Sequence, residues 1–214
     1  MTGKEDLSYR RITENIAGKL DLLEAYLFYC LALCSDCYTM VSNIKQESLT
    51  EFYGIKKDGQ IREWLHKFET LNLIQIDKRP VKGKYGSFDR CRYTLNTEHY
   101  VLITNRLYSE PISRQLKGFL ILLKCKCLNG TNTCKYIQNE LAKELNISES
   151  SVSRYLKQAE DNGYIKRDNN GIHLKDKKIF IITAETTFAL VKNIYPNILT
   201  DEDISERKIL NYNE

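Results

Sequence analysis

Three cysteines near the start of the chain have a spacing that could hold an iron–sulfur cluster. Cys30, Cys34 and Cys37 form a C-x3-C-x2-C array, and the iron of such clusters is held by cysteine thiolates. The first two thiols, however, fall in the apolar stretch 22–34, where cysteine commonly acts as a small core residue. The second half lacks the paired C-x2-C elements that zinc sites use, although it holds three thiols, Cys125, Cys127 and Cys134. We therefore expect no metal and no cofactor, with a thiol- or metal-sensing regulator as an alternative.

The sequence also lacks the usual signatures of catalysis. His66, His99 and His173 are scattered and belong to no recognisable triad or metal spacing. There is no Walker loop, no G-x-G-x-x-G and no G-x-S-x-G, so nucleotide hydrolysis and serine-type catalysis lack their motifs. We therefore expect that the protein is not an enzyme.

Hydroxyl and basic side chains between residues 148 and 158 are suited to contact nucleic acid. A helix over 149–162 that buries Val152, Leu156 and Ala159 turns its opposite side to solvent, at 100° per residue. That side carries short hydroxyls near the helix N-terminus, where free N–H groups favour phosphate, and then long donors that reach guanine or phosphate oxygens. The candidate DNA contacts of this helix and its cap are Ser148, Ser150, Ser151, Ser153, Arg154, Lys157 and Gln158.

The surrounding pattern indicates the elements that must hold this helix. Apolar residues spaced at i, i+3, i+4 and i+7 predict a helix over 113–128, and a second helix follows over 135–145 with Ile137 on its inward side. Asn146 can end that helix in the left-handed conformation, and Ser148 can cap the next one. After the third helix we expect a hairpin, with a strand at 165–167, a turn at 168–171 and a returning strand that ends at 178–183.

The run from Asn139 to Arg154, NELAKELNISESSVSR, resembles the core of the winged helix-turn-helix family. The stretch from Leu156 to Lys166 resembles the family's run into the hairpin, which is called the wing. The resemblance implies that the third helix reads the major groove of double-stranded DNA, with the wing beside it. The candidate DNA contacts of this wing are Lys166, Arg167 and His173.

The same layout occurs about 91 residues earlier in the chain. The repeated residues are Tyr9, Ile12, Thr13, Phe28, Cys34, Ile61, Leu65, Glu69, Ile74 and Asp77, which recur as Tyr100, Ile103, Thr104, Phe119, Cys125, Val152, Leu156, Glu160, Ile165 and Asp168. With a slip of one residue, Leu49 and Ile55 recur as Leu141 and Ile147. A period of this length suggests two whole small domains rather than a solenoid.

We therefore predict an α+β, mainly helical fold of two tandem winged helix-turn-helix domains, each with a three-helix core and a β-hairpin wing. The first domain spans residues 1–98 and the second, with the clearer helix-turn-helix, spans 99–183. Apolar residues after 184 suggest a C-terminal helical tail over 184–214.

The first copy presents its charges differently from the second. Its third helix turns Gly59, Glu63, His66 and Thr70 outward, and an acid in the middle of that face is a poor match to phosphate. Its basic candidates flank the helix or lie in the wing at 75–95: Arg62, Lys67, Lys78, Arg79, Lys82, Lys84 and Arg90. We infer that the second helix-turn-helix reads bases while the first wing grips the DNA backbone or minor groove. An alternative is that the first copy pairs subunits through the apolar helix at 20–34.

Charge and hydropathy indicate the broad class of protein. The net charge is only +4, but ten Lys or Arg stand against five Asp or Glu between Lys56 and Arg92, and such a basic region can bind polyanions. The longest apolar run, 22–34, is shorter than the about 20 residues that a membrane span needs. Residues 1–18 are polar and do not resemble a secretory signal. We expect a cytoplasmic protein without a membrane partner.

The tandem arrangement resembles that of plasmid and phage replication initiators, which use two winged-helix domains on one origin. The resemblance implies non-catalytic, sequence-specific binding of double-stranded DNA, used to initiate replication of a plasmid- or phage-type element or to regulate transcription. The partners that it implies are duplex DNA, a second copy in a homodimer, and replication or transcription machinery. The alternative from another class is a protein-interaction or assembly module that does not bind DNA, since winged helices also serve as rigid assembly pieces.

Overall fold

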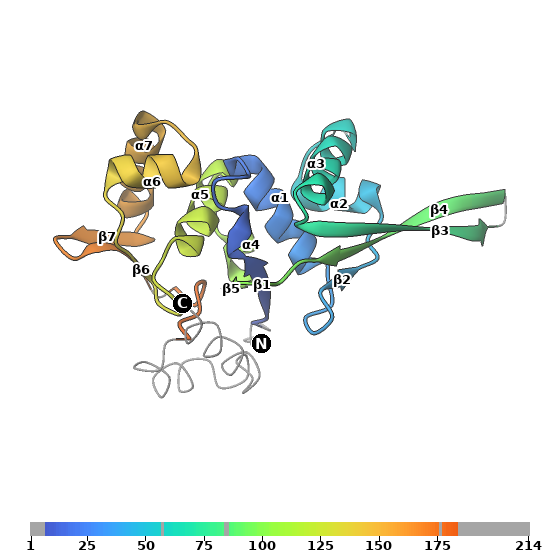
Figure 1. Ribbon diagram of the computed structural model, residues 1–214, viewed down its shortest axis with the longest axis horizontal. Coiled ribbons are helices and arrows are strands. Elements are labelled where there is room, and N and C mark those ends of the chain that lie inside the picture. The colour runs from blue at the N-terminus through green and yellow to red at the C-terminus, as the bar shows by residue number, and fades with distance from the viewer. Residues whose placement is uncertain (1–6, 57, 84–85, 176, 184–214) are drawn as a thin grey trace.

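One order of secondary-structure elements occurs twice along the chain. The computed structural model describes residues 7–56, 58–83, 86–175 and 177–183 (Figure 1). The first run of elements is β1 Tyr9–Thr13, the 3-10 helix η1 Glu14–Ile16, α1 Leu22–Leu33, β2 Val41–Ser42, α2 Gln46–Tyr53, α3 Asp58–Thr70, β3 Ile74–Gly83 and β4 Gly86–Leu95. The second run is β5 Tyr100–Thr104, α4 Arg106–Ser109, α5 Arg114–Cys125, β6 Thr133–Cys134, α6 Gln138–Leu145, α7 Glu149–Asp161, β7 Ile165–Asp168 and β8 Gly171–Leu174. The third helices of the two runs, α3 and α7, each have 13 residues.

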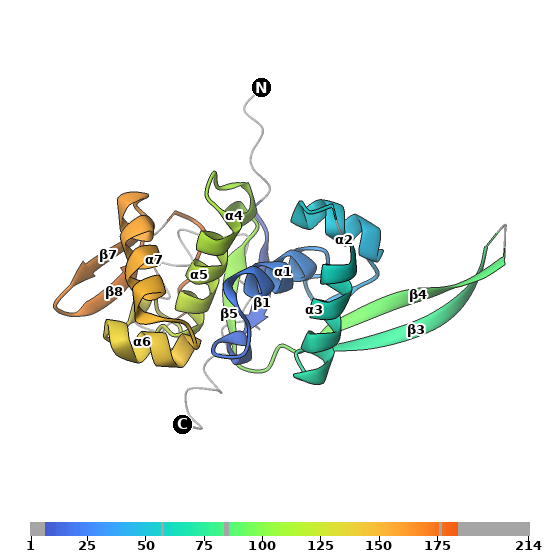
Figure 2. The same ribbon diagram turned by 90° about the horizontal axis from the view of Figure 1, so that it is seen from above.

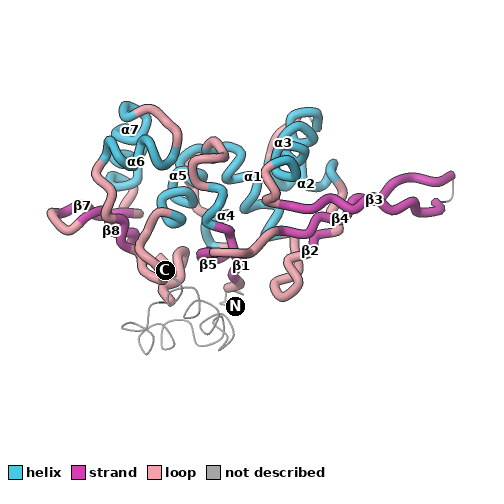
Figure 3. Tube along the Cα trace, viewed as in Figure 1, coloured by secondary structure: helices cyan, strands magenta, loops and turns pink. Residues whose placement is uncertain are grey.

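Each run contains a three-stranded antiparallel sheet with the same strand order. The orders are β2-β4-β3 in the first run and β6-β8-β7 in the second. The first hairpin is much longer, because β3 and β4 pair continuously from Ile74↔Leu95 to Gly83↔Gly86, whereas β7 and β8 pair over four residues each. At about 3.3 Å per residue, ten pairs span roughly 30 Å. This long hairpin projects from the body of the molecule, as Figures 1 and 3 show.

Helices α1 and α5 pack against each other at the centre of the molecule (Figure 2). Ten of the twelve residues of α1 are buried, and one hydrophobic core joins side chains from before and after residue 98. The helices approach closely at Gly118, where a Cβ atom would lie 1.7 Å from the carbonyl oxygen of Leu22. Since α1 is covered within its own chain, it offers no exposed apolar face with which to pair two subunits.

A third, smaller sheet connects the two runs. β1 pairs antiparallel with β5 from Tyr9↔Thr104 to Thr13↔Tyr100, and the central pair is Arg11↔Leu102. These two central residues are 91 positions apart, which is the separation of the repeated residues. Equivalent residues therefore face each other at the centre of this ladder, and the flanking pairs are arranged symmetrically about it, with Tyr9↔Thr104 at one end and Thr13↔Tyr100 at the other.

Residues 179–181 continue this sheet on the other side of β5. Ile103 forms a bridge with Phe180, and the N–H of Thr104 donates to the carbonyl of Ile179 at 2.9 Å. The prediction that the strand returning from the second hairpin runs to 178–183 is wrong. β8 ends at Leu174, and Lys178 has a left-handed backbone with φ of 58°, which breaks an extended strand.

The turn between α6 and α7 follows the sequence prediction. Asn146 is left-handed, with φ of 53°, and the hydroxyl of Ser148 accepts from the N–H of Ser151 at 3.2 Å as the cap of α7. The prediction that Ile137 lies inward is wrong, since its side chain is 60% exposed. The chain is extended there and α6 begins only at Gln138, so the helical period does not yet apply. Within the described residues, no helix is long and apolar enough to cross a bilayer.

Candidate nucleic-acid interface

Helix α7 presents its predicted polar side to solvent. Val152, Leu156 and Ala159 are buried, while Ser150, Arg154, Lys157 and their polar neighbours Ser153 and Gln158 are exposed. Figures 1 and 2 show α7 and α3 on the same side of the molecule, with β1 and β5 on the other side. The long donors of α7, Arg154 and Lys157, are therefore accessible from solvent.

Three hydroxyls are clustered at the start of α7. The Ser148 hydroxyl lies 3.0 Å from that of Ser150 and donates to that of Ser151 at 2.9 Å. Ser148 also lines a shallow hollow of about 410 Å³, together with Asn139 and Lys143. Hydroxyl groups beside a helix N-terminus form a surface that suits a phosphate oxygen.

The guanidinium of Arg154 lies against an aromatic pair. Its central carbon is 4.8 Å from the centre of the Tyr155 ring, and its Nη2 lies 3.4 Å from the Tyr155 hydroxyl. Tyr155 in turn stacks on Phe119 of α5, with ring centres 5.5 Å apart. This contact restricts an otherwise flexible side chain and connects it to the core.

In the second hairpin, two of the three candidate DNA contacts are bonded to other side chains of the protein. Arg167 forms an ion pair with Glu160 at 2.5 Å. His173 bonds through Nδ1 to the Thr133 hydroxyl at 3.1 Å and through Nε2 to Asp168 at 3.0 Å, and the hydrogen bond from His173 lowers the pKa of Asp168. Lys166, the third candidate, is exposed.

In the first run, Lys67 lies at the surface, but its ammonium group is paired with a buried carboxylate. Its ammonium contacts both carboxylate oxygens of Glu24, at 2.8 and 2.6 Å, and the Glu24 side chain is only 5% exposed. Glu24 also accepts the N–H of Asp21 in the capping box at the start of α1. This geometry favours a structural role for Lys67.

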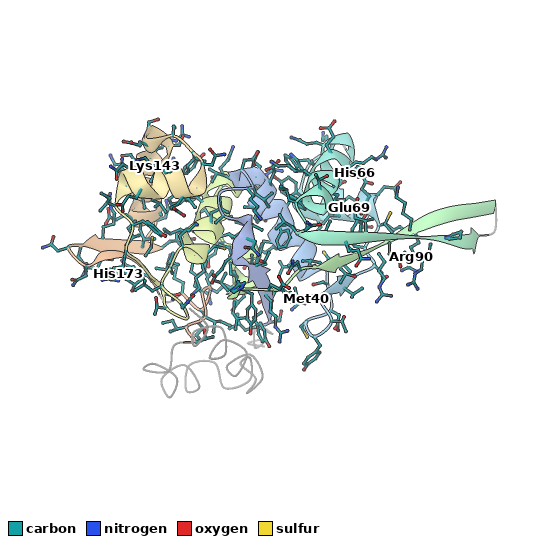
Figure 4. The ribbon with its side chains drawn as sticks, in the orientation of Figure 1. Met40, His66, Glu69, Arg90, Lys143 and His173 are labelled. Carbon is teal, nitrogen blue, oxygen red and sulfur yellow. The ribbon has the colours of Figure 1, made fainter. Side chains whose placement is uncertain are left out.

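The remaining basic candidates of the first run lie beside and along the long hairpin. Arg62, His66 and Lys78 line a hollow of about 230 Å³ between α3 and the hairpin. Arg79 pairs with Asp77 at 2.8 Å, whereas Arg90, labelled in Figure 4, is exposed near the middle of the hairpin. Two further candidates cannot be placed, because Lys84 lies outside the described residues and Lys82 is described only by its backbone, in β3.

Sequence reasoning missed one exposed cation on the same side. Lys143 of α6 lies next to the turn that precedes α7, and Figure 4 shows it on the side that also carries His66 of α3. Its position on the solvent-exposed face of α6 could have indicated this residue from the sequence.

Four of the seven thiols, those of Cys30, Cys125, Cys127 and Cys134, are buried, as expected for small core residues. Burial raises the pKa of Cys34 to about 11 and that of Cys127 to about 12. Within the described part of the chain, no group of three or more His, Cys, Asp or Glu side chains could hold a metal ion.

Comparison with known families identifies one segment. Residues 138–166 match the family model described as winged helix-turn-helix DNA-binding, which here covers α6, the turn, α7 and the start of β7. This segment is similar to winged helix-turn-helix DNA-binding domains. The resemblance predicted for residues 139–154 is confirmed, and no curated protein and no solved structure matches the chain. The match suggests that this part of the chain binds DNA.

Proposed function

We propose that this chain is a non-catalytic, sequence-specific binder of double-stranded DNA that carries two tandem winged-helix modules. The observation that carries the proposal is the exposed hydroxyl and cationic face of α7 within the matched winged helix-turn-helix. Direct reading of the major groove needs an exposed helix with donors of this kind. The role that we propose is initiation of replication of a plasmid- or phage-type element, or regulation of transcription.

The second module is inferred from the repeated element order. Both runs have the same strand order in their three-stranded sheets, and the β1–β5 ladder centres on Arg11 and Leu102, which are equivalent residues. Antiparallel pairing of equivalent residues is the pairing that a local two-fold axis produces. We infer that α3 and α7 are related by this axis and approach one duplex from the same side of the protein (Figure 2).

The packing between the runs would keep this arrangement rigid. Tyr108 of α4 donates to the carbonyl of Phe52 in α2, and Arg114 of α5 donates to the carbonyl of Gly54. On the other side, Gly18 lies so close to α6 that a Cβ atom would come within 2.8 Å of the Glu144 carbonyl oxygen. The distance between the two modules is then a property of the protein, and it should restrict the spacing of the DNA contacts.

The proposal assigns different tasks to the basic groups. Arg154 and Lys157 of α7 contact base edges, whereas Lys78 and Arg90 of the long hairpin contact the backbone or the minor groove. Backbone contacts provide affinity without sequence information, and base contacts provide the choice of sequence.

Selection of bound duplexes from a random pool tests the proposal. A binder of the proposed kind yields one consensus, and a complex that neutralises about six phosphates loses roughly a thousandfold in affinity between 50 and 200 mM salt. Sites mapped on a genome then separate the two roles. Several direct repeats in an origin favour replication initiation, and a single operator favours regulation. A protein-interaction module without DNA binding would enrich no sequence and show no salt-dependent affinity.

Single substitutions test the division of tasks. We expect Arg154→Ala to weaken specific binding by about 1 to 3 kcal/mol and to relax base choice at one position, while Lys78→Ala weakens all sequences alike. Equal, sequence-independent losses from both variants would contradict the assignment.

A further inference from the structure

The third helices of the two runs are equivalent residue by residue. α3 covers Asp58–Thr70 and α7 covers Glu149–Asp161, so each residue of α3 has its counterpart 91 positions later. The residues that α7 buries most deeply, Val152, Leu156 and Ala159, correspond to the buried residues Ile61, Leu65 and Phe68. The outward faces of the two helices can therefore be compared position for position.

On this comparison, Glu63 occupies the position of Arg154. Both side chains are exposed, and each precedes an aromatic residue, Trp64 in α3 and Tyr155 in α7, that packs against its own module. Within the described part of the chain, the Glu63 carboxylate makes no hydrogen bond or ion pair. Its helix, α3, lies on the same side of the molecule as α7 (Figures 1 and 2).

A carboxylate at this place cannot assist phosphate binding, but it can accept a hydrogen bond from a base. In the major groove, cytosine presents its N4 amino group as a donor and is the base that Glu and Asp side chains read. Guanine presents two acceptors and is the base that Arg reads. Arg62, which precedes Glu63 in α3, lines the hollow between α3 and the hairpin together with Lys78, and these cations could keep the DNA backbone close in spite of the negative charge of Glu63.

We propose that Glu63 determines base specificity in the first module by accepting a hydrogen bond from the N4 amino group of a cytosine. The DNA site then consists of two inverted halves that differ at the equivalent position, with guanine opposite Arg154 and cytosine opposite Glu63. A single chain would therefore bind its site in one orientation only. This inference depends on the proposed function, because it needs α3 and α7 to contact the same duplex.

The test is a comparison of the sequences that the wild-type protein and two Glu63 variants select from a random duplex pool. For Glu63→Ala, we expect the cytosine preference at one position to be lost, which is a change of about 5- to 100-fold at that base pair, with the other positions unchanged. For Glu63→Gln, we expect a shift of that position toward adenine, because Gln can pair with N6 and N7 of adenine. Ala and Gln both favour helix, and far-UV circular dichroism checks that α3 is retained.

Glu98→Ala serves as the matched control. Glu98 is also exposed, but it lies in the connection between β4 and β5 rather than on α3 or α7, and its variant should select the wild-type consensus. The inference is overturned if both Glu63 variants select that consensus unchanged, or if Glu63→Ala only raises the affinity for every sequence equally. A different result would contradict the proposed function itself: the wild-type protein would select no consensus at all.

Discussion

The close contact between α1 and α5 predicts that replacing glycine by alanine has opposite effects on stability at Gly118 and at Gly59. Gly118 of α5 faces the backbone of α1, where an added Cβ would lie 1.7 Å from the carbonyl oxygen and 2.6 Å from the carbonyl carbon of Leu22. Gly59 of α3 has no atom within 4 Å of the place that its Cβ would take. Gly118→Ala must therefore displace one helix, whereas Gly59→Ala displaces nothing.

The expected sizes follow from two competing terms. Alanine in place of a helical glycine stabilises by up to about 1 kcal/mol, and this is the whole effect that we expect at Gly59. At Gly118 the same gain is opposed by overpacking, which typically costs about 1 to 3 kcal/mol and is larger when the obstacle is backbone. We expect Gly118→Ala to lower the free energy of unfolding by about 2 kcal/mol, which corresponds to a fall of about 4 to 8 °C in Tm for a chain of this size.

Denaturant unfolding of the two variants provides the measurement. Trp64 is the single tryptophan of the chain and reports on the first run by fluorescence, while circular dichroism reports on all helices. If Gly118→Ala proved as stable as the wild type or more stable, the close crossing of α1 and α5 would not exist in the form described. Gly59→Ala is the control for a general effect of replacing a helical glycine by alanine.

Three further predictions concern individual side chains. Lys67→Ala should lower stability by about 1 to 3 kcal/mol in denaturant titrations, because it leaves the carboxylate of Glu24 buried without its partner, and it should leave DNA affinity in native buffer within twofold. His173→Ala should raise the pKa of Asp168 as measured by NMR; because the pKa of Asp168 is lowered in the folded state, its contribution to stability is complete above the ordinary value of 3.8 and is lost as pH falls below it. Cys127, whose pKa is raised to about 12, should resist alkylation at pH 8 in the native protein and react after unfolding, as followed by mass spectrometry.

The sequence was sufficient for those elements whose signals are local. The limits and outward face of α7 follow from its helical period, from Asn146 at the end of α6 and from the cap Ser148, all within a few residues of one another. The repeated Glu69 and Glu160 can also be understood afterwards from local geometry, since each accepts the backbone N–H seven residues later at 3.3 Å.

Several features escaped prediction because they exist only through partners distant in the chain. β2 and β6 have two residues each and are strands only because β4 and β8 pair with them. The same applies to the segment that begins at Ile179, which joins a sheet through Thr104 rather than continuing the hairpin before it. Patterns within a short window carry no information on such pairings.

The sequence by itself determined that α7 exists, which of its side chains face outward and that residues 138–166 resemble a winged helix-turn-helix. These properties depend on the spacing of apolar residues and on turn chemistry, which act over a few residues. Only the tertiary structure decided that Lys67 forms an ion pair with Glu24, that α1 is buried against α5 and that β1 pairs with β5 around Arg11 and Leu102. Those contacts join residues up to about 100 positions apart, and they form because folding buries apolar helices and pairs backbone groups that the local sequence leaves unpaired.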